Sequence, residues 1–251
     1  MSEWISAAIV CAICLAGAAA GTGLRRVLPG HHLSPESKDV VRLGSALIAT
    51  IAALVLSLLI SSAKSSFDTQ RSEVRQMAAS IVQLDRTLDL YGPEGREIRV
   101  LLRQAIVPWV EHIWHDQTTR PGLESESGAP AERVYTGIMA LAPKDEIQRA
   151  LKPQLVQVST SIARVRYELF EQSDGSIPLP FLAVLVFWLA IIFASFSLFS
   201  PLNPTTIAAL VVFALSASGA IFLILEMDQP FAGLLQISDA PLRSALAPLA
   251  P

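Results

Sequence analysis

The chain has 251 residues, of which 52% are hydrophobic and 16% are charged. A soluble domain of this size is less apolar, so the composition excludes an ordinary soluble protein and indicates a protein of the membrane. The formal net charge of −3, with no Lys/Arg-rich cluster beyond the short loops, argues against a nucleic-acid partner.

Four apolar segments without a charged residue or histidine divide the chain into two pairs: Ile5–Leu24 and Leu43–Ala63, then Leu179–Phe199 and Thr205–Leu225. A helix of about 20 apolar residues can cross the roughly 30 Å of hydrocarbon in a bilayer. The sequence therefore predicts four transmembrane helices in an all-α protein. We expect the first to be retained rather than cleaved as a signal peptide, because no positive charge precedes it.

The same segments set the expected domain boundaries. We expect a first transmembrane pair over residues 1–64, an extramembrane helical insert over 65–178, a second transmembrane pair over 179–226 and an interfacial tail over 227–251. Positive residues near span ends favour the cytoplasmic side. Six Lys and Arg residues lie near span ends on the side of the insert and tail, against four in the loop between the first two spans. This count favours the cytoplasm for the insert and both termini.

The first span carries Gly17 and Gly21 in a G-x-x-x-G pair. Small residues at this spacing let two helix backbones approach closely in a membrane. The pair predicts that this helix packs against another span, and an Ala-rich helix that faces lipid is the alternative.

Small residues occupy every fourth position of the second span and of its continuation: Ala49, Ala53, Ser57, Ser61 and Ser65. Residues four apart lie on one face of a helix, so these five form a continuous line, here called the small-residue stripe. Such a stripe either packs against another helix, which is its commoner use, or lines a path for ions.

Apolar residues of the insert recur three and four residues apart in two places, a spacing typical of a coiled-coil seam. The first seam continues from the second span, ends at Gly92-Pro93 and contains Val74, Met77, Ile81, Leu84, Leu88 and Tyr91. The second seam precedes the third span and contains Leu151, Leu155, Val158, Ile162, Val165 and Leu169. The seams pair either with each other or with their copies in another subunit.

Between the seams we expect an amphipathic helix over Glu94–Gln117, a mobile loop over Thr118–Pro130 and a short helix over Ala131–Leu141. The first of these helices ends in a cluster of potential metal ligands: Glu111, His112, His115 and Asp116. Two imidazoles and a carboxylate are ligands that suit zinc or iron. Carboxylate–histidine pairs four residues apart on a solvated helix face explain the same residues without a metal. We expect no cofactor.

Two acidic residues, Glu226 and Asp228, stand where the fourth span ends, and Lys64 stands at the end of the second. Interfacial charges that anchor helix ends are the ordinary interpretation. The functional hypothesis is a cation site, or a salt bridge that couples the tail to the second helix.

Four segments carry a resemblance to a known family: His31–Val40, Leu47–Ser57, Ser62–Asp68 and Glu226–Gly233. Together they resemble the bacterial bestrophin-like domain family, membrane proteins of unknown function, over essentially the whole chain. The layout is more distantly similar to bestrophins, which are pentameric anion channels with four membrane helices and a cytosolic helical part between the second and third. The resemblance implies that the second span lines a pore and that the protein resides in the bacterial inner membrane.

The chain departs from bestrophins in two places. Pro230-Phe231 beside acidic residues is similar to the bestrophin turn, but the acidic run that binds calcium there is missing. The second span also has no Phe, Tyr or Trp, whereas the bestrophin pore neck is rich in aromatic residues. The resemblance therefore implies neither gating by calcium nor the aromatic pore neck that forms part of the bestrophin conduction path.

The sequence thus predicts a homo-oligomeric ion channel, for anions, whose second span lines the pore. The alternative is a non-conducting scaffold or sensor whose insert binds a protein partner while the spans anchor it in the bilayer. Enzymatic activity is not expected, because a membrane enzyme needs a nucleophile or an acid–base group near the bilayer and only the Glu111–Asp116 cluster could supply one.

Overall fold

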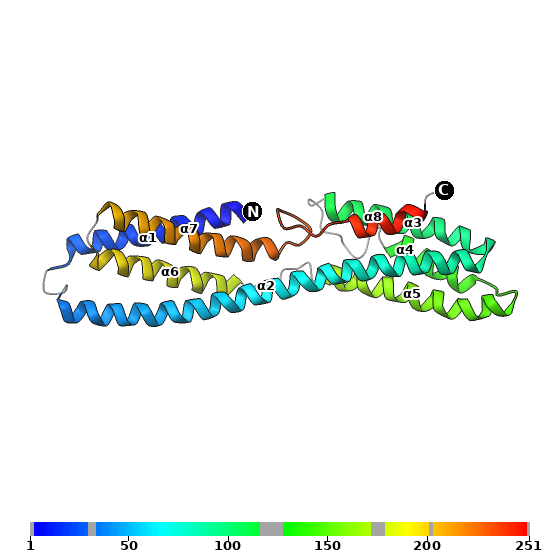
Figure 1. Ribbon diagram of the computed structural model, residues 1–251, viewed down its shortest axis with the longest axis horizontal. Coiled ribbons are helices and arrows are strands. Elements are labelled where there is room, and N and C mark those ends of the chain that lie inside the picture. Colours follow the sequence, from blue (N-terminus) through cyan, green and yellow to red (C-terminus); the bar gives the residue numbers. More distant parts are fainter. Residues whose placement is uncertain (1–2, 30–33, 116–127, 172–178, 201–202, 250–251) are drawn as a thin grey trace. The chain divides into compact units, whose positions relative to one another are not determined.

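The computed structural model describes residues 3–29, 34–115, 128–171, 179–200 and 203–249, and these residues contain helices and no strand. The all-α prediction is therefore confirmed for the described part of the chain (Figure 1). The helices are α1 (Glu3–Val27), α2 (Pro35–Tyr91), α3 (Pro93–His115), α4 (Gly128–Ala140), α5 (Glu146–Glu171), α6 (Leu179–Phe199), α7 (Pro204–Met227), α8 (Ala240–Leu246) and the 3₁₀ turn η3 (Ala247–Leu249).

The chain forms two compact units. One unit, here called the membrane unit, comprises residues 1–66 and 175–228, and the other, the insert unit, comprises residues 67–174 and 229–251. Helix α2 contributes to both, because it is one continuous helix of 57 residues.

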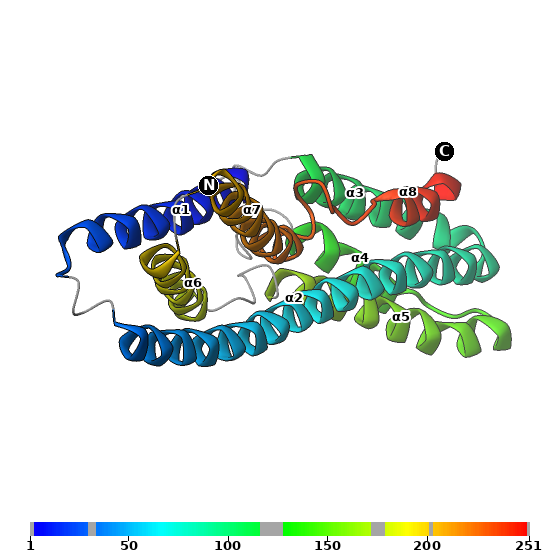
Figure 2. The same ribbon diagram turned by 60° about the vertical axis from the view of Figure 1, so that its left-hand side comes forward.

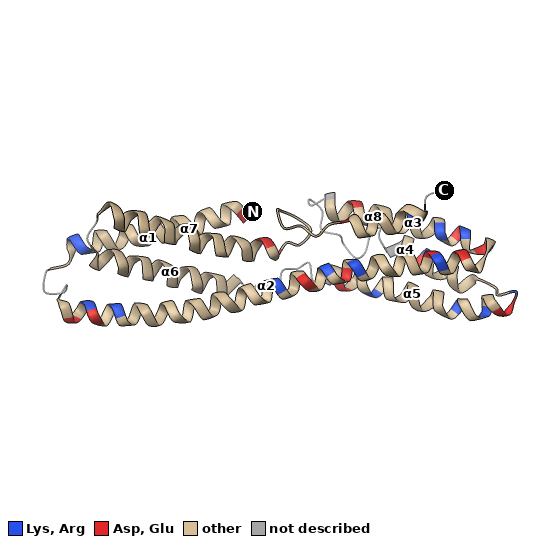
Figure 3. Ribbon diagram, viewed as in Figure 1, with Lys and Arg blue, Asp and Glu red and all other residues tan. Residues whose placement is uncertain are grey.

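Four helices, α1, α2, α6 and α7, are long and apolar enough to cross a membrane. Each contains one of the apolar segments of the sequence, and Figure 3 shows that the charged residues of these helices lie outside those segments. A helix of about 20 residues is enough to cross a bilayer, whereas α2 has 57 residues. Helix α2 therefore continues beyond its apolar segment. Gly92 ends it with a φ of 106°, a conformation that favours glycine.

Within the membrane unit, α1 packs against α6 and α7 (Figures 1 and 2). Gly17 and Gly21 make the contact with α6: a Cβ on Gly17 would lie 2.6 Å from the carbonyl oxygen of Ala190, and one on Gly21 only 2.1 Å from that of Ala194. The prediction of helix packing through this pair is confirmed, and the lipid-facing alternative is wrong for this face. Arg25 donates a hydrogen bond of 2.6 Å from Nη1 to the Ser200 carbonyl, which holds the end of α1 to the end of α6.

Within the insert unit, both predicted seams lie in one hydrophobic core. All six residues of the first seam are at most 2% exposed, and five of the second seam are at most 8% exposed. Figure 1 shows α5 beside the second half of α2, and Figure 2 shows the same arrangement. Both seams are thus buried by residues of the same chain.

Polar contacts hold this core together where α2 ends and where α3 and α5 begin. The Gln148 side chain donates to the Tyr91 carbonyl at 2.8 Å, which joins the start of α5 to the end of α2. Lys144 forms a salt bridge with Glu94 at the start of α3. The hydrogen bond from Lys144 lowers the pKa of the Glu94 carboxyl, and that carboxylate raises the pKa of Lys144.

The C-terminal tail packs on the insert unit. The Trp114 indole of α3 donates to the Ile237 carbonyl at 2.7 Å, and its ring meets Phe231 edge-on with centroids 5.0 Å apart. The buried apolar residues of the tail belong to the core of the insert: Ile237, Leu242, Ala245 and Leu249. Protein therefore covers these four residues, whereas Leu234 and Leu235 of the same tail are exposed, and contact of the tail with lipid remains a prediction.

Candidate functional sites

The small-residue stripe lies on the surface of the single chain. Ala53, Ser57, Ser61 and Ser65 are exposed, and Ala49 is partly buried. The residues that α2 buries in the membrane unit lie on another side of the helix: Ser45, Ala52, Leu59 and Ala63. Whatever covers most of the stripe in the membrane is therefore lipid, water or another copy of the chain.

The charged residues at the span ends differ in burial. Glu226 lies in the last turn of α7 and is 2% exposed, whereas Lys64 on α2 is exposed. Asp228 follows α7 and donates from its backbone N–H to the Ile224 carbonyl at 3.2 Å. A buried carboxylate is costly unless it is paired, and Glu226 does have a polar or electrostatic interaction within the structure. A coupling of these acids to Lys64 remains a prediction.

The predicted metal ligands fall at the end of α3. Glu111 is exposed and His112 is partly buried. Asp116, the His115 side chain and most of the predicted loop over Thr118–Pro130 lie outside the described residues. Among the residues that are described, no group of three or more His, Cys, Asp or Glu side chains is placed to hold a metal ion. The metal site therefore remains a prediction.

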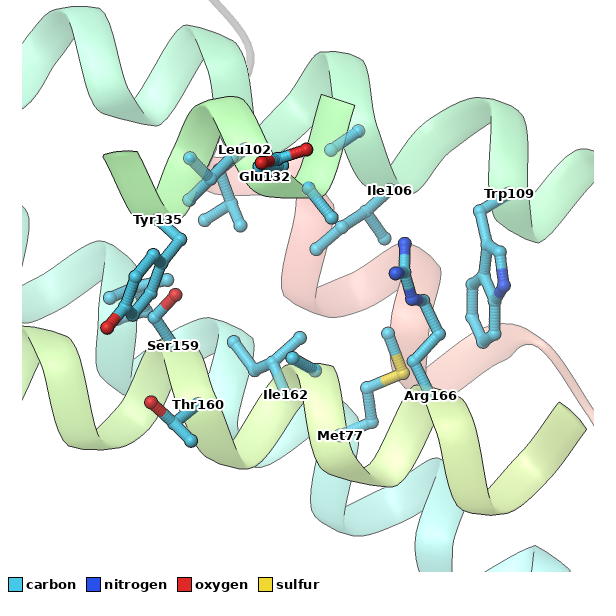
Figure 4. Close-up of a pocket in the computed structure, with 15 residues that line it drawn as sticks. Met77, Leu102, Ile106, Trp109, Glu132, Tyr135, Ser159, Thr160, Ile162 and Arg166 are labelled. Atoms are coloured by element: carbon cyan, nitrogen blue, oxygen red, sulfur yellow. The ribbon is translucent and has the colours of Figure 1, made fainter. Parts of the chain in front are cut away.

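A cavity of about 380 Å³ opens between the helices of the insert unit (Figure 4). Its wall is mainly apolar and includes Met77, Leu102, Ile106, Trp109 and Ile162. Its polar side chains are Glu132, Tyr135, Ser159, Thr160 and Arg166. Figure 4 shows Arg166 of α5 extending into this space toward Ile106, beside Trp109. The partial burial of Arg166 lowers the pKa of its guanidinium.

Sequence reasoning did not find this cavity. Met77 and Ile162 appear in the sequence only as seam residues, and nothing in the spacing of α4 shows that it leaves a gap beside them. The cavity depends on how four helices meet, which is a property of the packed structure rather than of any segment.

Comparisons with known proteins agree with the helical layout. Residues 11–242 match the family model described as Bestrophin-like domain. The fold is similar to crystal structures of two variants of a bacterial bestrophin homologue from Klebsiella pneumoniae. The first variant is 14% identical in sequence, and the alignment covers 99% of this chain and 99% of that chain with a TM-score of 0.73. The second variant is 15% identical, and the alignment covers 99% of this chain and 98% of that chain with a TM-score of 0.72. No curated protein matches the sequence significantly.

Proposed function

The chain belongs to the Bestrophin-like domain family, and from that premise we propose that this membrane protein forms an oligomeric ion channel, for anions, in which α2 of each copy lines the conduction path. We further place the insert and both termini in the cytoplasm and the spans in the bacterial inner membrane. The assignment of residues 1–64 and 179–226 to the bilayer and 65–178 to the insert is part of this proposal.

The observation that carries the proposal is the exposure of the small-residue stripe. Ser57 and Ser61 lie in the apolar part of α2 and yet are exposed in the single chain. A serine hydroxyl that faces hydrocarbon finds no partner outside its own helix and can donate only to the carbonyl about one turn earlier, as Ser195 does. In a water-filled path between copies of the chain, water provides hydrogen-bond partners for these hydroxyls. Such a path therefore explains why serine occupies this face of α2.

Several copies are needed to enclose such a path. One helix face per chain cannot surround ions, so the copies must be arranged around a central axis, as closed cyclic symmetry allows. The apolar segments contain no charged residue, so selectivity comes from the pore diameter and from the dipoles that line it rather than from a ring of charges.

We expect the purified protein to run in detergent as an oligomer of several 27.0 kDa chains and to pass chloride when it is reconstituted into liposomes. Light scattering after gel filtration measures the mass, and a chloride-loaded proteoliposome assay measures the flux. Protein-free liposomes are the control. A monomer or dimer, or an oligomer that passes neither chloride nor sodium, contradicts the proposal.

A sensor is the second candidate, and the cavity of the insert unit favours it. An apolar pocket with a few convergent polar groups is the usual form of a small-molecule site. Arg166 supplies such a group on a wall that is otherwise largely apolar (Figure 4). In this alternative the insert binds its partner or ligand while the spans serve as an anchor.

A further inference from the structure

The membrane unit contains a second cavity, of about 770 Å³, where α2 begins and where α6 ends and α7 starts. This end of the unit is the one that carries the loop between the first two spans, opposite to the end from which α2 continues into the insert unit. The part contributed by α2 consists of one helix face: Lys38, Val41, Arg42, Ser45, Ala46 and Ala49. Helices α6 and α7 contribute Phe196, Phe199, Ala209, Leu210 and Phe213 among others.

The mouth of this cavity carries two positive charges. Lys38 and Arg42 line it one helical turn apart, and within the described part of the chain their side chains form no hydrogen bond or ion pair. The acidic neighbours on α2, Glu36 and Asp39, are exposed and do not line the cavity. Arg25 adds a further positive charge at this end, although its guanidinium is occupied by the Ser200 carbonyl. Among the described residues at this end, the basic Arg25, Arg26, Lys38 and Arg42 thus outnumber the acidic Glu36 and Asp39, which leaves a net positive charge.

The polarity of the cavity falls with depth. From Lys38 to Ala49 the wall descends eleven residues of α2, or roughly 16 Å at 1.5 Å per residue, which is about one leaflet of a bilayer. The deeper wall presents Leu210 and Phe213. The Ser195 hydroxyl at this depth donates to the Ile191 carbonyl at 2.8 Å, so it does not require a polar ligand. The cavity thus changes from cationic to apolar over the thickness of a leaflet.

We propose that this cavity binds one phospholipid with an anionic headgroup, with its phosphate between Lys38 and Arg42 and an acyl chain along α2 and α7. A lipid of this class matches both ends of the cavity, because anionic headgroups are attracted to juxtamembrane Lys and Arg and hydrocarbon matches the apolar wall. A helix from a second copy fits less well, since the apolar segments of this chain contain no acidic residue to meet the two cations. The proposal does not depend on ion conduction.

Native mass spectrometry of the full-length protein with phosphatidylglycerol or phosphatidylcholine tests the proposal. We expect the wild type to retain phosphatidylglycerol in preference to phosphatidylcholine. Lys38→Gln and Arg42→Gln should each weaken phosphatidylglycerol binding roughly five-fold, the effect of one basic residue near a lipid surface. Ala46→Phe should also lower binding without a change of charge, because it fills the cavity. Arg26→Gln is the matched control, since Arg26 is exposed at the same end but does not line the cavity.

Three results would overturn the proposal. Equal losses in Arg26→Gln and Arg42→Gln would show a diffuse surface charge rather than a site. Displacement of the lipid by glycerol 3-phosphate alone at equal concentration would show a site for free phosphate. A change of oligomer mass in Arg42→Gln with unchanged lipid binding would show that another copy fills the cavity.

Discussion

Replacing Gly21 with leucine is expected to lower the free energy of unfolding by about 3 kcal/mol, the upper part of the usual range for overpacking. A Cβ at Gly21 would lie 2.1 Å from the carbonyl oxygen of Ala194 and 2.9 Å from its Cα. These are backbone atoms that cannot rotate away, so α1 must separate from α6. Circular dichroism in detergent should show an unfolding midpoint lower by roughly 6 to 12 °C.

Gly23→Leu is the matched control for this change. The two glycines lie on the same helix, and a Cβ at Gly23 would meet nothing within 4 Å. Both substitutions gain the same intrinsic helix propensity, so the difference between them isolates the contact with α6. Equal midpoints for the two variants would contradict the close packing of α1 on α6.

Replacing Arg99 with methionine is expected to destabilise the insert unit by about 3 kcal/mol, because it leaves the carboxylate of a largely buried ion pair alone. Arg99 Nε donates to Asp85 Oδ1 at 2.6 Å, and the side chain of Asp85 is 6% exposed. Methionine keeps much of the volume of the arginine stem, so the loss reports the charge rather than a cavity. The thermal unfolding midpoint of the full chain, followed by circular dichroism, measures the effect.

Arg96→Met controls for the removal of a positive charge, because Arg96 is exposed one turn earlier on α3. It should change stability by no more than about 0.5 kcal/mol. Adding Asp85→Leu to Arg99→Met should recover much of the loss, since an apolar pair often replaces a buried ion pair without cost. If the double variant is no more stable than Arg99→Met, the unpaired carboxylate is not the cause.

The sequence predicted the parts of this fold that local patterns encode. The length of the apolar segments predicted α1, α6 and α7, and the three–four spacing of Val74, Met77 and Ile81 predicted that α2 continues into a buried seam. The spacing of Gly17 and Gly21 predicted a close helix contact, although not that α6 is the partner. Each of these features repeats within a few residues, so it is visible without the rest of the chain.

The remaining features depend on side chains that are distant in sequence. The bond from Trp114 to the Ile237 carbonyl joins residues 123 positions apart, and no spacing rule indicates it. The same holds for the cavity beside Arg166 and for the cavity between α2, α6 and α7, which require three or more helices to be in place. In the candidate site, the sequence identified the small residues of α2, and the structure was needed to find that four of the five are exposed.

The central claim is that the four exposed residues of the small-residue stripe face a water-filled conduction path, and labelling of Ser57→Cys tests it most directly. Cys11 and Cys14 are the only cysteines of the chain, so both are first replaced with alanine. Leu58→Cys is the control: Leu58 is 67% exposed and is turned away from Ser57 by about 100° around α2.

A charged, water-soluble thiol reagent should react with Cys at position 57 and block chloride flux into proteoliposomes, because thiolate forms only where water reaches it. The reagent should leave the flux of the Leu58→Cys protein unchanged. Flux that persists in the Ser57→Cys protein, with no more labelling than in the Leu58→Cys protein, would contradict the account.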